Sequence, residues 1–310
     1  MTNTSIYHDI ATRTGGDIYL GLVGPVRTGK STFIKRFMET LVIPNIEDVY
    51  ARERAKDELP QSGSGRTIMT AEPKFVPEDA VSVTLDGGVS FSVRLIDCVG
   101  YMVDGASGQF EDGVERMVAT PWFEDEVPMS RAAEEGTRRV IMDHSTIGVV
   151  MTTDGSVCGI PRESYVPAEE RVVSELRGIG KPFVLVLNSA DPASEEAQAL
   201  RSELEEKYGV ACICVNCLEL SADDIDDILK LALYEFPIAE LGIYLPSWLD
   251  ALSDDAPLRS GILGAIAESV QNMSRVRDAF GIMGALGGRE EVDSAGVTAI
   301  EMGTGCVTGR

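Results

Sequence analysis

The feature that most constrains this chain is the octapeptide at residues 24–31, Gly-Pro-Val-Arg-Thr-Gly-Lys-Ser. It matches the pattern G-x-x-x-x-G-K-S, whose glycines let consecutive backbone N–H groups curl around phosphate oxygens. An apolar, strand-like run at 18–23 precedes it and a helical pattern at 31–42 follows it. The amino end of that helix would also face the bound anion. The sequence therefore predicts a phosphate-binding loop of the Walker A type.

Two side chains of this loop have specific expected roles. We expect the Lys30 ammonium to neutralise the β- and γ-phosphates and the Ser31 hydroxyl to bind Mg²⁺. Most of the other contacts would come from the backbone. The predicted nucleotide-binding residues are Gly24, Pro25, Val26, Arg27, Thr28, Gly29, Lys30, Ser31 and Thr32.

A second motif, D-x-x-G, occupies residues 97–100 at the end of a strand-like run. Asp97 could hold Mg²⁺ through water, and the Gly100 N–H could bind the γ-phosphate. Between the two motifs a switch threonine should complete the Mg²⁺ coordination. Thr70 is preferred for this role over Thr67. The predicted metal ligands are therefore Ser31, Thr70 and Asp97, and the predicted catalytic residues are Lys30, Thr70 and Asp97.

The base-reading element N-K-x-D is only partly present. After the apolar run at 183–187 the chain reads Asn188-Ser189-Ala190-Asp191, so a serine replaces the lysine. Asp191 could pair with guanine, or it could cap the turn before Pro192. The identity of the base stays open on these residues.

The residue that orients the attacking water is also not evident. Small GTPases often place a glutamine directly after D-x-x-G, whereas this chain has Tyr101. Hydrolysis should therefore be slow, or be completed by another part of the chain or by a neighbouring subunit. Arg27 and Arg66 are candidate charge stabilisers, and a surface salt bridge is the plainer role for each.

Strand-like and helical patterns alternate along the first three quarters of the chain, which is typical of a parallel sheet. We expect an α/β fold: a P-loop NTPase of the GTPase-like, TRAFAC type, with a mostly parallel sheet and helices on both faces. The predicted domains are a nucleotide-binding domain at 1–236 and the start of a second domain at 237–310.

The sequence also predicts individual segments along the chain. They are a loosely ordered lead-in (1–16), a loop-rich segment (44–80), a hairpin (81–85 and 89–96), an acidic insertion (101–135), strands (147–152, 183–187, 210–215) and helices (167–177, 194–208, 222–235, 262–280).

Charge and cysteine content restrict the partners and the compartment. With 50 acidic and 27 basic residues the net charge is −23, which argues against nucleic-acid binding and against docking on anionic lipid. No signal peptide and no apolar stretch long enough to insert in a membrane is evident. Six sparse cysteines favour a reduced, cytoplasmic protein. Cys212, Cys214 and Cys217 are interpreted as core residues rather than metal ligands.

Several segments together closely resemble the stage IV sporulation protein A family of P-loop ATPases. They are GPVRTGKSTFIKRFMETLVIPNI, SGSGRTIMTAEPKFVPEDAV, LIDCVGY, VLNSADP and EFPIAELGIYLPSWL. The resemblance implies ATP with Mg²⁺, and hydrolysis that drives self-assembly into the basement layer of the bacterial spore coat. It also implies a location in the mother cell at the outer forespore surface. The implied partners are a small amphipathic membrane-anchoring peptide and other coat proteins, and the implied sensor threonine is Thr70.

This chain differs from the family in length. Family members are considerably longer, so we expect the end of a middle domain and a C-terminal domain to be missing, and with them part of the assembly function. Two alternatives stay open. Asp191 would suit a GTP-dependent regulatory switch, and Tyr101 would suit a scaffold that binds nucleotide without hydrolysing it.

Overall fold

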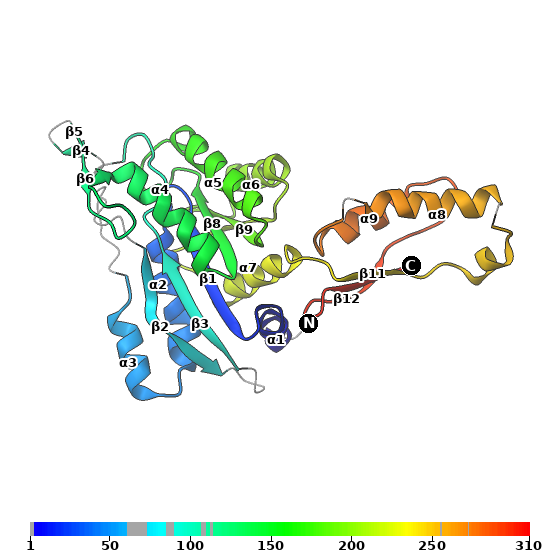
Figure 1. The fold of residues 1–310 in the computed structure, drawn as a ribbon, viewed down its shortest axis with the longest axis horizontal. Helices are drawn as coiled ribbons and strands as arrows, with labels where there is room; N and C mark the ends of the chain where they lie inside the picture. Colours follow the sequence, from blue (N-terminus) through cyan, green and yellow to red (C-terminus); the bar gives the residue numbers. More distant parts are fainter. Residues whose placement is uncertain are drawn as a thin grey trace. The chain divides into compact units, whose positions relative to one another are not determined.

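The computed structural model of the protein describes residues 3–60, 73–84, 90–106, 110–111, 114–254, 256–271 and 273–310. The chain divides into two compact units, Met1–Ala232 and Leu233–Arg310. The first contains a six-stranded sheet in the order β10-β9-β8-β1-β3-β2 (Figure 1). These strands are β1 (Asp17–Val23), β2 (Lys74–Thr84), β3 (Ser90–Asp97), β8 (Ile147–Thr153), β9 (Phe183–Asn188) and β10 (Cys212–Val215).

Five of these six strands are parallel, and the edge strand β2 runs antiparallel to β3. Helices connect the parallel strands, as such crossovers require. This confirms the predicted α/β class with a mostly parallel sheet. The α-helices of this unit are α1 (Asn3–Thr14), α2 (Lys30–Phe37), α3 (Val49–Asp57), α4 (Met129–Arg139), α5 (Val166–Ile179), α6 (Glu195–Tyr208) and α7 (Ala222–Tyr234), in which the division between the units falls.

Both faces of the sheet are buried. Val150 and Leu185 belong to an apolar cluster that also contains residues of α4, α5 and α6. Their neighbours Val149 and Val184 point to the opposite face and are equally inaccessible, at 1% and 0% exposed. Helices α1 and α2 lie against β1 and β3, and buried residues such as Phe33 lie outside that cluster. These helices therefore cover the second face, and both faces carry helices as predicted.

The amino-terminal segment differs from the prediction of a loosely ordered lead-in. Residues 3–14 form α1, in which Ile6 and Ile10 lie one turn apart and are buried. The Tyr7 ring stacks on Phe91 with centroids 5.6 Å apart, and the Tyr7 hydroxyl donates a hydrogen bond to Asp226 of α7. This helix depends on tertiary packing rather than on its own polar sequence.

The segments expected to be loops also contain regular structure. The loop prediction for 44–80 is wrong at two places. Helix α3 begins after Asp48, whose carboxylate caps it by accepting a hydrogen bond from the Tyr50 N–H. Strand β2 begins at Lys74, before the predicted loop ends. The turn of the predicted hairpin, at 85–89, lies outside the described residues. The acidic insertion ends in α4, and its described residues include four short strands. These are β4 (Phe110–Glu111), β5 (Val114–Glu115), β6 (Met117–Val118) and β7 (Val127–Pro128).

The second unit is a small three-stranded sheet with two helices. Its central strand pairs in parallel with one neighbour and antiparallel with the other. The single helix predicted at 262–280 is instead two helices. The Asp278 carboxylate, at the start of the second helix, accepts hydrogen bonds from the Ser274 and Arg275 N–H groups of the connection and so holds that connection in a turn. The elements are β11 (Glu240–Ile243), β12 (Val297–Glu301), β13 (Cys306–Gly309), α8 (Pro257–Val270) and α9 (Asp278–Gly287).

Candidate nucleotide-binding site

The loop at residues 24–29 joins β1 to α2 at the carboxyl edge of the parallel strands, as the motif requires. Gly24 has a φ of 135°, and a Cβ there would lie 2.2 Å from the Met151 carbonyl oxygen of β8. Only glycine fits such a close backbone approach. Arg27 has a φ of 65° and is the one non-glycine residue with positive φ in the described part of the chain. The loop is therefore a tightly folded turn rather than an open connection.

Lys30 lies at the centre of this turn. It is 5% exposed, and its Nζ donates to the carbonyl oxygens of Pro25 at 2.6 Å and Gly24 at 3.4 Å. Burial lowers the pKa of the Lys30 ammonium, while Cys98 and Asp97 act in the opposite direction. The Thr28 hydroxyl also donates to the Pro25 carbonyl, at 3.0 Å. The loop thus encloses the Lys30 ammonium, which suits an anionic ligand.

Ser31 and Asp97, two of the three predicted metal ligands, lie side by side. The Ser31 hydroxyl donates to Asp97 Oδ2 at 2.6 Å, whereas Asp97 Oδ1 is buried without a hydrogen-bond partner. Burial raises the pKa of Asp97, against the opposing effects of the Ser31 hydrogen bond and of Lys30. A hydroxyl and a carboxylate with an unused oxygen form the hard-oxygen donor set that Mg²⁺ prefers. These residues therefore fit the cation. Thr70, together with Thr67 and Arg66, lies outside the described residues.

The segment after Asp97 is attached directly to the loop. The Tyr101 N–H donates to the Gly24 carbonyl at 3.2 Å, and the Val26 N–H donates to the Tyr101 carbonyl at 2.8 Å. A Cβ on Gly100 would lie 2.1 Å from the Gly24 carbonyl oxygen. These contacts place the Gly100 backbone against the loop, where the sequence predicts a γ-phosphate contact.

The side chain of Tyr101 packs against α5. It is 3% exposed, its hydroxyl donates a hydrogen bond to Glu175, and the Arg171 guanidinium lies over its ring at 5.1 Å. The phenol is therefore a core residue between the loop and α5. That Tyr101 cannot replace the water-orienting glutamine stays a prediction.

Asn188 supports the loop from β9. Its amide nitrogen donates to the Thr28 carbonyl at 3.0 Å, and its amide oxygen accepts the Cys217 N–H at 3.0 Å. A Cβ on Gly29 would lie 2.4 Å from the Asn188 amide nitrogen. The sequence pattern suggested Asn188 only as part of a base-reading motif, so this contact with the loop was missed. The one signal for it in the sequence is that Asn188 lies at the end of a buried strand.

Asp191 is placed differently from Asn188. It is exposed, and its carboxylate accepts the Ala193 N–H at 3.3 Å in the turn before α6. The cysteines near this edge, Cys212, Cys214 and Cys217, are free thiols. Among the described residues no group of three or more His, Cys, Asp or Glu side chains is arranged to hold a metal ion.

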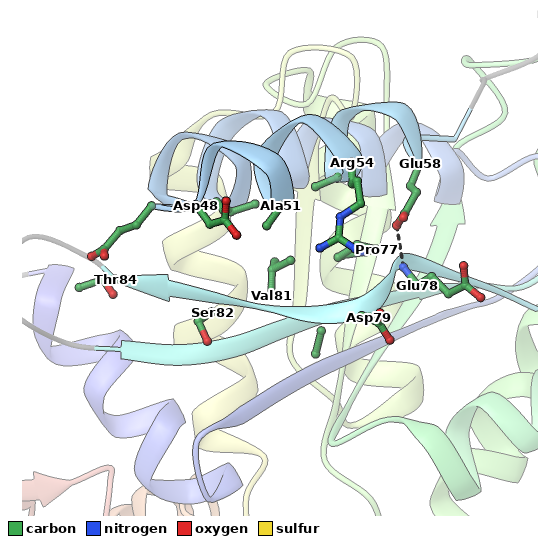
Figure 2. A pocket seen from close by; sticks show the side chains of 14 residues that line it. Asp48, Ala51, Arg54, Glu58, Pro77, Glu78, Asp79, Val81, Ser82 and Thr84 are labelled. Carbon is green, nitrogen blue, oxygen red and sulfur yellow. Dashed lines mark hydrogen bonds between the residues drawn. The ribbon is translucent and has the colours of Figure 1, made fainter.

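A pocket of about 550 Å³ lies between α3 and the edge strand β2 (Figure 2). Arg54 projects from α3 toward Pro77, and the Glu78 N–H donates to Glu58 Oε2 at 2.7 Å. Carboxylates surround the single guanidinium, so this pocket suits an anionic nucleotide less well than the loop does. The carboxylates are Glu47, Asp48, Glu58, Glu78 and Asp79.

The parallel sheet, the tight loop and the Ser31–Asp97 pair define an α/β protein of the nucleoside-triphosphatase kind. The family model "Stage IV sporulation protein A, ATPase domain" matches residues 1–237, and the model of the middle domain of the same protein matches residues 238–309. The chain belongs to the stage IV sporulation protein A family.

Individual relatives agree with this assignment. The chain is 50% identical over 305 residues to stage IV sporulation protein A of Clostridioides difficile (strain 630), and 49% identical to the proteins of that name from Bacillus subtilis (strain 168) and Bacillus anthracis. Each match covers 98% of this chain and 62% of the relative. The chain thus spans less than two thirds of the length of these relatives.

Proposed function

We propose that this chain binds ATP at the Gly24–Ser31 loop and hydrolyses it slowly, as a P-loop NTPase of the GTPase-like, TRAFAC type. The observation that carries the proposal is the geometry at the loop, where a buried ammonium lies beside a hydroxyl–carboxylate pair with an unused oxygen. The match to an ATPase domain over residues 1–237 supports ATP as the nucleotide. Neither that match nor the turn-capping contact of Asp191 favours the GTP-switch alternative.

In this proposal each predicted residue has one task. Residues 24–32 wrap the phosphates, and the Lys30 ammonium neutralises their charge as it leaves the carbonyls of its own loop. Ser31, Asp97 and Thr70 hold Mg²⁺, with Thr70 as the sensor threonine. Mg²⁺ supplies neutralisation of the negative charge on the β- and γ-phosphate oxygens. Asn188 keeps the loop in the shape that these contacts need.

We further propose that hydrolysis drives self-assembly into the basement layer of the spore coat. The partners would be further copies of this protein, a small amphipathic membrane-anchoring peptide and other coat proteins, without nucleic acid. The site of action would be the mother-cell cytoplasm at the outer forespore surface. We place the ATPase domain at 1–236 and the start of a middle domain at 237–310. Among the described helices none is both long and apolar enough to cross a membrane.

The test is a phosphate-release assay with ATP and with GTP, followed by sedimentation of the product. We expect release from ATP that disappears in Lys30→Ala, because the charge at the centre of the loop is lost. Lys35→Ala, which removes a charge from the exposed side of α2, where Lys35 lies 3.9 Å from Glu39, is the matched control and should keep the wild-type rate. Turnover of GTP but not ATP would overturn the proposal. ATP binding without phosphate release would favour the scaffold.

A further inference from the structure

Arg27 is an unusual residue at an unusual backbone position. It lies in the middle of the phosphate loop at a φ of 65°, in the left-handed region that glycine occupies most readily. The other positive-φ positions of the described chain are all glycines. Non-glycine residues held in this region concentrate at functional sites, where the surrounding structure compensates for the strain. The side chain of Arg27 therefore needs an explanation.

Two of the three nitrogens of the Arg27 guanidinium have no hydrogen-bond partner in the described part of the protein. They are Nε and Nη2, which are both buried, and Arg27 makes no ion pair with any described residue. Its neighbours Cys158 and Tyr165 are hydrogen-bonded to each other, with Sγ and Oη 2.8 Å apart. Among the described residues, the surface salt bridge considered as its plainer role is therefore not formed. Buried donors without acceptors are costly, and a guanidinium fork is well suited to phosphate oxygens.

The backbone around Arg27 is held on both sides. Val26 donates its N–H to the Tyr101 carbonyl at 2.8 Å, and the Thr28 carbonyl accepts from Asn188 at 3.0 Å. The Arg27 side chain can therefore change direction by rotation about its own bonds while the loop keeps its shape. An anion bound in the loop would offer the acceptors that Nε and Nη2 lack.

We propose that Arg27 is a catalytic arginine that acts in cis: its guanidinium donates hydrogen bonds to the β- and γ-phosphate oxygens as the phosphoryl group is transferred. This role rests on the proposed ATP hydrolysis. In that reaction the water oxygen forms a bond to the γ-phosphorus while the bond from the γ-phosphorus to the bridging oxygen breaks. The electron pair of the broken bond stays on ADP, and a water proton leaves with phosphate or solvent. Arg27 stabilises the negative charge that develops on the bridging oxygen.

The test compares three variants, Arg27→Ala, Arg27→Lys and Arg27→Gly, in Mg²⁺ with ATP under single turnover. We expect the hydrolysis rate of the alanine variant to fall about 10³-fold, as for other arginines that stabilise this transition state. ATP affinity should change less than about fivefold, because the loop backbone and Lys30 remain. Lysine should restore little, since it lacks the guanidinium fork. Guanidinium chloride at millimolar, non-denaturing concentration should partly restore the alanine variant.

Arg27→Gly separates function from folding. Glycine suits the left-handed backbone, so this variant should unfold at the same temperature as the wild type or higher and still lose hydrolysis. A second readout is the binding of ADP with fluoroaluminate, a mimic of the transferring phosphoryl group. The gain in affinity that fluoroaluminate gives the wild type should vanish in Arg27→Ala, while affinity for ADP alone is kept.

Three outcomes decide between the explanations. A wild-type protein that does not hydrolyse ATP contradicts the proposed function and with it this role. A wild type that hydrolyses ATP, together with an Arg27→Ala rate within fivefold of it, overturns only the role of Arg27. Equal losses of ADP and ADP–fluoroaluminate affinity would make Arg27 a ground-state binding residue and would also overturn the proposal. Lys35→Ala, which removes one positive charge from the exposed side of α2, should match the wild type throughout.

Discussion

The brace formed by Asn188 can be tested quantitatively with Asn188→Ala. The substitution removes two hydrogen bonds of 3.0 Å and leaves the Thr28 carbonyl and the Cys217 N–H without these partners. Asn188 is 4% exposed, so water reaches neither group easily. Each unsatisfied buried group costs about 1–3 kcal/mol, and the two together lower the free energy of unfolding by about 2–6 kcal/mol. For a unit of this size that corresponds to a fall in melting temperature of roughly 5–20 °C.

The assay is urea unfolding followed by circular dichroism, together with titrations of ATP and GTP. Because Asn188 holds the loop rather than a base, both nucleotides should lose affinity by the same factor. Asp191→Ala is the matched control, since Asp191 is exposed and makes one contact of 3.3 Å to the Ala193 N–H. It should change stability by about 0.5 kcal/mol or less. A loss below about 0.5 kcal/mol in Asn188→Ala, or a changed ATP-to-GTP preference at unchanged stability, would refute the brace.

Three further predictions follow from neighbouring contacts. Gly100→Ala should lower the free energy of unfolding by about 1–3 kcal/mol and weaken nucleotide binding. Gly100 has a φ of 91°, and an added Cβ would lie 2.1 Å from the Gly24 carbonyl oxygen. Thermal unfolding measures the first effect and ATP titration the second. Tyr101→Gln should not speed phosphate release, and it should destabilise the protein by about 3 kcal/mol, because that position faces α5 and lies in the core. Burial raises the pKa of the Asp226 carboxyl above its ordinary value, against the hydrogen bond from Tyr7. Ionising this carboxyl in the folded protein therefore lowers the free energy of unfolding as the pH rises through the folded-state pKa. The stability advantage of Asp226→Asn over wild type in urea should therefore be larger at about pH 8 than at about pH 4.

Sequence patterns predicted the parts of the fold in which local signals and tertiary context agree. The apolar runs that form β8 and β9 are buried on both faces, so hydrophobicity alone identifies them. The motif at 24–31 predicted a strand, a turn and a helix, and the structure has all three. Ser31 and Asp97 lie side by side because Ser31 is in the first turn of α2, which follows β1, and Asp97 ends β3, which pairs in parallel with β1.

Other parts depend on contacts that no local pattern carries. Helix α1 has a polar sequence and is fixed by Tyr7, which reaches Phe91 and Asp226 far along the chain. The brace from Asn188 to Thr28 spans 160 positions, and a base-reading motif offered a competing interpretation of the same residue. The break between α8 and α9 coincides with hydrogen bonds from the Ser274 and Arg275 N–H groups to the Asp278 carboxylate, which an uninterrupted helical pattern does not reveal.

The two hydrogen bonds between Tyr101 and the loop determine which segment can respond to the nucleotide. In nucleotide switches, the segment after the metal-linked aspartate changes its course when the γ-phosphate leaves. Here such a change would break both backbone bonds and, at the same time, withdraw the Tyr101 ring from Arg171 and Glu175. These losses would be simultaneous, so the segment resists small displacements. Under the proposed mode of ATP binding, we therefore expect this side of the site to stay in place and a motion that reports hydrolysis to start in another segment of the chain.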